Sequence, residues 1–240
     1  MNILSIGNSF SVDATRYFYS LAKENGIELK NVNLYSEGCN LESHCNIAIN
    51  ERAEEVFQFN GEETKMLVSL KQVLKSEEWD YITFQQASFW SPDYSTYQPY
   101  LNKLISYVKE YLPNAKIVLH QTWAYKEGSV KLVDRTKYKT HIEMFSDVKK
   151  AYNQAVEEIK PFGLIPCGEV VQKCVEKGLN MFRDDLHLSL GTGRFALALT
   201  WLCYFYKLDA KKVKLCKFDE PISKKDVKIV KKIVNEVLGR

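Results

Sequence analysis

Short apolar strands alternate with longer helical patterns along the whole chain, and this alternation constrains the fold more than any other feature of the sequence. Five brief runs rich in apolar and β-branched residues have the length of strands: Asn2–Ile6, Leu29–Leu34, Tyr81–Phe84, Lys116–His120 and Gly163–Ile165. Runs of this kind are typical of parallel strands that are buried on both faces. The pattern predicts a three-layer α/β/α sandwich built around a five-stranded parallel sheet.

Apolar residues recur at helical spacing between these strands, in the ranges Thr15–Lys23, Thr64–Leu74, Tyr97–Tyr111, Ile142–Ile159 and Phe195–Tyr206. The segment Glu54–Glu63 alternates weakly around Asn60-Gly61 and predicts a small hairpin or an irregular excursion. No stretch rich in proline, glycine and serine divides the chain. Residues 1–240 are therefore expected to form a single domain.

The charge of the chain is nearly balanced, with 33 basic and 30 acidic residues and a net charge of +3. This balance argues against a dedicated nucleic-acid-binding protein, which has a strong basic excess on one face. The basic excess falls in the segment Lys207–Arg240. Within that segment, Lys224–Leu238 places valines and isoleucine on one side and lysines on the other. This pattern predicts an amphipathic helix that packs on the core and exposes a charged face.

Two absences bear on where the protein is expected to work. No charged leader or small-residue cleavage site precedes Asn2–Ile6, and no apolar run reaches the ~18 residues that span a bilayer. We therefore expect a cytoplasmic protein that does not bind a membrane. The six cysteines include no Cys-x-x-Cys pair, and no second ligand pair follows Cys39, His44 and Cys45. Reduced thiols and no metal site are expected.

A turn that suits a nucleophile follows the first predicted strand. Gly7 permits a tight turn, and Ser9 then stands at the start of a helix. The N–H groups and the positive dipole end of that helix favour a developing anion. Because serine and asparagine are also the preferred N-cap residues, the same turn can serve as a simple helix cap. Polar residues follow the other strands too, and parallel strands end at one edge of the sheet, where ligands bind.

An acid–histidine pair lies near the C-terminal helices, at Asp184 and His187. An aspartate three residues before a histidine can accept its Nδ1–H, which leaves Nε2 free to face a nucleophile. A solvent-exposed cap is the competing interpretation, because Asp185 and Ser189 also precede a helix. Together with Ser9, the pair predicts nucleophilic catalysis by a serine.

The order and spacing of these motifs resemble those of the SGNH (GDSL-like) hydrolase family. That family has a Gly-Asp-Ser turn, a glycine after the second strand, a Gly-x-Asn-Asp motif after the third strand and Asp-x-x-His near the C-terminus. Here the corresponding segments are Gly7-Asn8-Ser9-Phe10, Gly38, Gln85-Gln86-Ala87-Ser88 and Asp184-Asp185-Leu186-His187. The third motif is absent, and the chain resembles a bacterial branch of the family that carries Gln-Gln in its place. The resemblance implies the SGNH-hydrolase fold, which is flavodoxin-like.

The resemblance also implies a role for each residue. Ser9 is the nucleophile, His187 is the general base and then the general acid, and Asp184 orients the imidazole and stabilises the imidazolium. The oxyanion hole consists of the Ser9 and Gly38 backbone N–H groups and the side chain of Gln86, with Gln85 as the alternative. No metal or cofactor is implied.

An α/β-hydrolase is the competing serine-hydrolase fold, and two features exclude it. Ser11 replaces the second glycine of the G-x-S-x-G nucleophile elbow. Asp184 also lies only three residues before His187, whereas the acid of an α/β-hydrolase comes well before the histidine in the chain.

Aromatic residues crowd the same edge of the predicted sheet, and Trp90 and Trp123 are candidates to stack on a sugar, although they can equally belong to the packed core. Gln85 and His120 are further candidates to line the pocket, and a core histidine is an equal interpretation of His120. We expect a serine esterase that removes a short acyl group, acetyl by resemblance, from an oligosaccharide or another small molecule. The alternatives are a thioesterase or lysophospholipase for longer acyl chains and a non-catalytic binding module that kept the fold.

Overall fold

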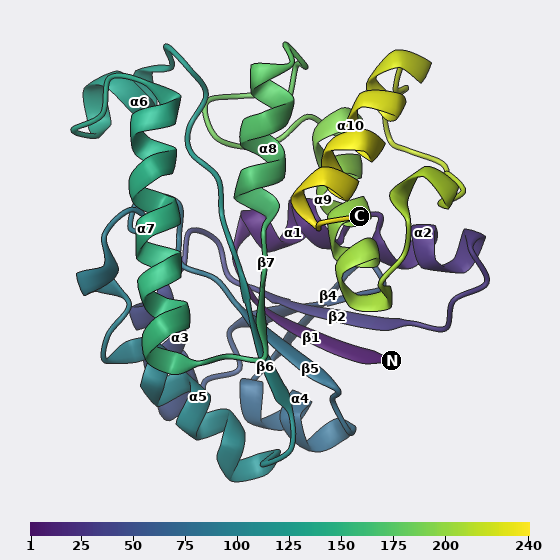
Figure 1. The fold of residues 1–240 in the computed structure, drawn as a ribbon. Helices are drawn as coiled ribbons and strands as arrows, with labels where there is room; N and C mark the ends of the chain where they lie inside the picture. Colours follow the sequence, from purple (N-terminus) through teal and green to yellow (C-terminus); the bar gives the residue numbers. More distant parts are fainter.

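The computed structural model describes all residues 1–240 and contains one sheet between two layers of helices (Figure 1). The seven strands lie in the order β4-β3-β2-β1-β5-β6-β7. Five of them are mutually parallel: β1 (Asn2–Gly7), β2 (Lys30–Tyr35), β5 (Tyr81–Phe84), β6 (Lys116–His120) and β7 (Gly163–Ile165). Each coincides with a predicted strand to within one residue at either end. The short apolar runs therefore predicted the parallel part of the sheet.

The predicted count of five strands is wrong, because an antiparallel hairpin extends the sheet beyond β2. Its strands are β3 (Glu55–Phe59) and β4 (Glu62–Val68). Asn60 and Gly61 form the turn, and both have the positive φ that two-residue hairpin turns require. The excursion expected at Glu54–Glu63 is thus part of the sheet.

The hairpin also corrects the helix that was predicted from Thr64 to Leu74. The first part of that range belongs to β4, and helix α4 (Leu70–Ser76) begins only after Ser69. The side chains of Ser69 and Gln72 form a capping box at this point, which satisfies backbone N–H groups that the helix itself leaves free. Pairing of β4 with β3 overrides the helical spacing of its apolar residues.

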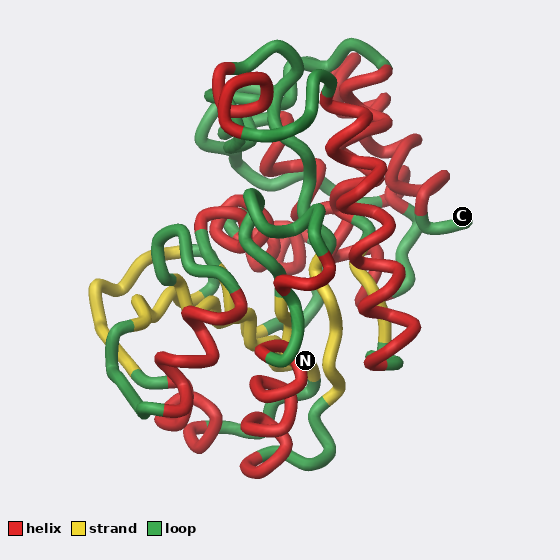
Figure 2. Tube along the Cα trace, turned by 90° about the vertical axis from the view of Figure 1, so that its left-hand side faces the viewer, coloured by secondary structure: helices red, strands yellow, loops and turns green.

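Helices cover both faces of the sheet, as the alternating pattern predicted. One face carries α1 (Ser9–Thr15), α2 (Phe18–Glu24), α8 (Cys167–Glu176), α9 (Thr192–Tyr206) and α10 (Lys224–Val237). The other carries α3 (Leu41–Ile49), α4, α5 (Tyr100–Tyr111) and α7 (His141–Ile159). The short helix α6 (Val130–Arg135) and two 3₁₀ turns, Tyr94–Thr96 and Ala210–Lys212, complete the chain. A view from the side shows the strands between these helices (Figure 2).

Each helical layer closes its own hydrophobic core against one face of the sheet. On β1, Ile3 contributes to the core under α9, and Leu4 and Ile6 contribute to the core under α5 and α7, as the alternation of side chains along a strand requires. Helix α10 buries Val230, Ile233 and Val234 and leaves most of its lysines towards solvent, as its amphipathic pattern predicted. No helix is long and apolar enough to cross a membrane.

Candidate active site

The serine that the motif singled out lies at the first turn of α1, directly after the central strand β1. Asn8 is the N-cap residue of this helix, because its Oδ1 accepts a hydrogen bond from Phe10 N at 3.0 Å. Its Nδ2 donates to Cys39 O at 3.0 Å and so ties the turn to the loop after β2. Asn8 thus caps the helix, and the hydroxyl of Ser9 is left free for another partner.

Glycine is required at position 7 because this turn has no room for a side chain. A Cβ at this position would lie 2.8 Å from Ser11 Oγ and 3.0 Å from Gln85 Cδ, both closer than ordinary contacts. Glycine therefore lets the backbone of β1 pass directly under the helix that carries Ser9.

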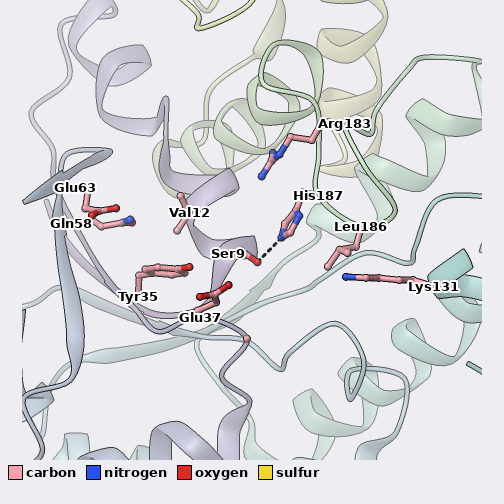
Figure 3. A pocket seen from close by; sticks show the side chains of 11 residues that line it. Ser9, Val12, Tyr35, Glu37, Gln58, Glu63, Lys131, Arg183, Leu186 and His187 are labelled. Atoms are coloured by element: carbon pink, nitrogen blue, oxygen red, sulfur yellow. Dashed lines mark hydrogen bonds between the residues drawn. The ribbon is translucent and has the colours of Figure 1, made fainter. Parts of the chain in front are cut away.

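Ser9, His187 and Asp184 form one hydrogen-bonded chain (Figure 3). The Oγ of Ser9 lies 2.9 Å from Nε2 of His187, and Nδ1 of His187 lies 2.8 Å from Oδ2 of Asp184. The other carboxylate oxygen of Asp184 accepts hydrogen bonds from the backbone N–H of Leu186 at 2.9 Å and of His187 at 2.7 Å. The carboxylate is therefore held by the same loop that carries the imidazole.

The ionisation of Asp184 decides which ring nitrogen of His187 carries the proton. Burial raises the pKa of Asp184, but hydrogen bonds from the backbone and the ring of His187 and from Leu186 outweigh it and bring that pKa to about 2. Asp184 is consequently a carboxylate at any ordinary pH and can only accept. In a neutral imidazole, Nδ1 then carries the proton, and Nε2 accepts from the Ser9 hydroxyl.

A buried carboxylate fixes the loop of His187 to the helix of Ser9. Asp13 lies one turn after Ser9 on α1 and is fully buried. Its carboxylate accepts from Leu188 N at 3.0 Å, from Arg183 Nη1 at 2.9 and 3.0 Å, and from Arg194 Nε at 2.8 Å. Arg183 and Leu188 flank the Asp184–His187 segment on either side. Asp13 therefore sets the distance between the two halves of the site.

Aromatic packing supports the same loop from the sheet side. Phe10 stacks on Trp123 with ring centroids 3.9 Å apart, and its ring lies edge-on to His187 at 6.2 Å. Trp123 Nε1 donates to Leu186 O at 2.9 Å. The rings hold the loop in place and limit the movement of the imidazole.

The cavity beside Ser9 has a volume of about 460 Å³, and most of its lining residues are polar or charged. On one side of Ser9 lie Leu186 and Lys131, and on the other lie side chains from β2, β3 and β4 (Figure 3). The lining residues are Ser9, Val12, Tyr35, Glu37, Gly38, Gln58, Glu63, Lys131, Arg183, Leu186 and His187. Gly38 has φ +63°, and its N–H has no acceptor in the protein. The predicted residues Ser9, Gly38 and His187 thus share one cavity, and Asp184 lies behind His187.

Gln86 is not placed to serve an oxyanion, and that prediction is wrong. Its side chain is fully buried, and its Nε2 donates to Thr96 O at 3.0 Å and to Thr96 Oγ1 at 3.1 Å. Its Oε1 accepts from the backbone N–H groups of Leu41 and Ala87. With both ends of the amide engaged, Gln86 ties the start of α3 to the loop after β5.

Gln85 and His120 do not line the cavity, contrary to prediction, because both are buried beneath the turn of Ser9. Nδ1 of His120 lies 3.0 Å from Oε1 of Gln85, and Nε2 of Gln85 donates to Oδ1 of Asn8 at 2.9 Å. Burial lowers the pKa of His120 to about 3, so the ring is neutral and donates through Nδ1. These two side chains support the cap of α1 from below.

Neither predicted tryptophan lies where a ligand beside Ser9 could stack on it. Trp123 is fully buried under Phe10, and Trp90 is 42% exposed but does not line the cavity. The aromatic residues that the sequence places after the strands are divided between the core and a separate surface.

Sequence reasoning missed Asp13 and the residues of the hairpin. An acid one helical turn after Ser9, among the apolar residues Phe10 and Ala14, was a signal that Asp13 faces inward and has a partner. No local signal could have brought Gln58 and Glu63 to the cavity, because their place depends on the pairing of β3 with β2. No cluster of three or more histidine, cysteine, aspartate or glutamate side chains is arranged to hold a metal ion.

The fold that surrounds this site is that of the SGNH hydrolases. A candidate SGNH hydrolase from Slackia heliotrinireducens has a TM-score of 0.60 at 23% identity, with 84% of this chain and 97% of that chain covered. The Clostridium thermocellum family 3 carbohydrate esterase has a TM-score of 0.51 at 13% identity, with 86% and 96% covered. At these identities the likeness concerns the fold alone.

The family itself follows from a match over nearly the whole sequence. The chain belongs to the family described as Domain of unknown function (DUF4886), which it matches over residues 2–236. A DUF4886 family protein from Bacteroides uniformis has a TM-score of 0.90 at 28% identity, with 99% of this chain and 94% of that chain covered. None of the curated proteins matches this sequence.

Proposed function

We propose that this protein is a serine hydrolase of carboxylic esters, with Ser9, His187 and Asp184 as its catalytic residues. The observation that carries the proposal is the hydrogen-bonded chain from Asp184 through His187 to Ser9, which ends at a cavity large enough for a small ester. Ester hydrolysis needs a nucleophile, a base within hydrogen-bond reach and a group that orients the base. Ser9, His187 and Asp184 lie at hydrogen-bond distances that suit these three roles.

The proposed reaction has two halves. The Ser9 hydroxyl attacks the ester carbonyl while His187 Nε2 takes its proton, and the Asp184 carboxylate stabilises the imidazolium that forms. His187 then gives the proton to the leaving alcohol, and an acyl-enzyme remains on Ser9. A water molecule that His187 deprotonates attacks this acyl group, and the second tetrahedral intermediate collapses to the carboxylic acid and free Ser9.

Two backbone groups are the proposed donors to the oxyanion. Ser9 is the first residue of α1, where N–H groups have no acceptor within the helix, and Gly38 N–H is free of any protein acceptor. Gly38 adopts a left-handed conformation that glycine adopts without strain. With Gln85 and Gln86 engaged elsewhere, the proposed hole relies on these two N–H groups.

The proposed substrate is a short acyl ester, with acetyl as the acyl group, of a carbohydrate or another small metabolite. The cavity supports a polar alcohol because only three of its 11 lining residues are hydrophobic, and four others carry charged side chains. A carbohydrate esterase is among the proteins that share the fold. The alternative substrate, a longer acyl thioester or lysophospholipid, predicts a rate that rises with acyl length.

The experiment compares wild type, Ser9→Ala and the matched control Ser11→Ala with p-nitrophenyl acetate, butyrate and octanoate. We expect Ser9→Ala to lose at least ~10³-fold in kcat, and Ser11→Ala to retain activity because its hydroxyl donates to the backbone oxygen of Asn8. A fluorophosphonate probe should label wild type and not Ser9→Ala. Undiminished turnover by Ser9→Ala would refute the mechanism. Failure of wild type to hydrolyse any ester or to be labelled would favour a non-catalytic binding module.

A further inference from the structure

The cavity beside Ser9 has one wall that the parallel sheet does not provide. Tyr35 ends β2, Glu37 follows it, and Gln58 and Glu63 come from the added hairpin β3–β4; these four residues are here called the acidic arm (Figure 3). They lie on the side of Ser9 opposite to Lys131 and Leu186. The hairpin therefore shapes what the cavity can bind.

Gln58 points to a ligand because it is almost fully buried and yet has a free amide group. Its side chain is 6% exposed, and its Oε1 accepts from Asn33 Nδ2 at 2.7 Å. Its Nε2 makes no hydrogen bond within the protein, and the residue lines the cavity. Nε2 is not among the side-chain atoms that are buried without a partner, so it is accessible from the cavity. The amide offers a donor to an oxygen atom of whatever occupies the arm.

The charges of the arm are unbalanced. No cation pairs with Glu37 or Glu63, whereas the neighbouring Glu62 pairs with Arg16. Burial and then the charges of Glu37 and Glu63 raise the pKa of Tyr35, so both carboxylates act on the same phenol. Arg183, the guanidinium that lines the cavity, pairs with Asp13, which it shares with Arg194. Two negative charges without partners therefore face this end of the cavity.

We propose that the acidic arm binds a positively charged nitrogen in the alcohol part of the ester substrate. Glu37 and Glu63 then lie around this nitrogen, and Gln58 Nε2 donates a hydrogen bond to a nearby oxygen of the substrate. The inference rests on the proposed function and specifies its substrate class. A neutral sugar would use Gln58 but would leave the two carboxylates without a counter-charge. An acidic group would be repelled by them.

The test compares a cation with its neutral isostere. Acetylcholine and 3,3-dimethylbutyl acetate have the same shape and differ in one permanent charge, as do choline and 3,3-dimethylbutan-1-ol. For wild type we expect kcat/KM for the cationic ester, and affinity for choline in an NMR titration, to exceed the values for the neutral partner about tenfold. Added salt should reduce this preference, because Glu37 and Glu63 are exposed to solvent.

Variants locate the preference within the arm. Glu37→Gln combined with Glu63→Gln should bring the ratio of cation to neutral partner to about one. Glu62→Gln is the matched control, since it removes the same charge from the adjacent position of β4 but from a residue paired with Arg16 outside the cavity. It should keep the wild-type ratio.

Equal affinity for choline and its isostere in wild type would overturn the inference, and so would a preference that survives in the double variant or disappears equally in Glu62→Gln. Hydrolysis that depends on Ser9 but shows no preference for a cation would refute only the proposed cation binding by the acidic arm. Retention of hydrolysis by Ser9→Ala would refute the proposed function, and the NMR titrations would still measure the arm because they do not depend on turnover.

Discussion

Asp13 provides the sharpest test of how the tertiary structure holds the two halves of the site together. Asp13→Asn keeps the size of the side chain but removes a fully buried negative charge that Arg183 and Arg194 share. Asparagine has one acceptor oxygen, whereas the carboxylate accepts from three different residues. At least one of these donors must lose its partner in the variant.

The loss in stability can be bounded from known cases. Removal of one partner of a buried ion pair costs about 3–5 kcal/mol, and the asparagine oxygen recovers part of it, which leaves ~3 kcal/mol. For a domain of this length, 1 kcal/mol lowers Tm by roughly 2–4 °C, so we expect a decrease of about 6–12 °C. Displacement of the His187 loop by about 1 Å should also lower kcat about 10²-fold at a temperature where the variant is folded.

The assay pairs thermal unfolding with steady-state kinetics, and Asp219→Asn is the control. Asp219 also accepts from Arg194, at 3.4 Å, and pairs with Arg16, but it is partly exposed and does not touch the His187 loop. Exposed pairs contribute ~0.2–1 kcal/mol, so the control should lose little stability and keep its kcat. An Asp13→Asn variant with the Tm and the kcat of wild type would refute the role assigned to Asp13.

Two further substitutions test the buried residues Gln86 and His120. Gln86→Leu should lower the free energy of unfolding by about 1–3 kcal/mol, because Leu41 N–H and Thr96 lose their partners. It should lower kcat by much less than the 10²–10³-fold expected for loss of an oxyanion donor. A loss of kcat of about 10²–10³-fold at unchanged stability would instead assign Gln86 to the oxyanion hole. Burial lowers the pKa of His120 in the folded state to about 3, below the value of about 6.5 in the unfolded state. Between pH 6.5 and 3 the unfolded state therefore binds more protons than the folded state, and the free energy of unfolding decreases as the pH falls. The free energy of unfolding of the variant His120→Asn should therefore fall less steeply between pH 6.5 and 3 than that of wild type, by up to ~1.4 kcal/mol per pH unit. The same pH dependence in both proteins would contradict the burial of a neutral imidazole.

The sequence by itself determined the parallel sheet and the three residues of the hydrogen-bonded chain. Brief apolar runs such as Lys116–His120, in which only Lys116 is exposed, predict buried parallel strands because most of their side chains are apolar, and this signal is local. Asp184 and His187 are three residues apart, so their mutual contact is local as well. The link to Ser9 spans 178 positions and came from the order and spacing of motifs, which resemble those of a known family.

Only the tertiary structure decided which polar side chains reach the cavity. Gln85 and Gln86 are neighbours with the same side chain, yet one supports Asn8 and the other binds Thr96, because their partners are brought near by strand pairing and loop packing. Trp123 is a core residue for the same reason, as Phe10 stacks upon it.

The hairpin shows the same division between local pattern and long-range contact. Its turn at Asn60-Gly61 is visible in the sequence, but its pairing with β2 is not, since a strand edge accepts a partner by backbone hydrogen bonds that carry little sequence information. That pairing brings Gln58 and Glu63 to the cavity of Ser9 and adds one negative charge to it. The order of motifs along this sequence thus predicts where Ser9 and the Asp184–His187 pair stand, and long-range backbone pairing decides which hairpin side chains reach their cavity.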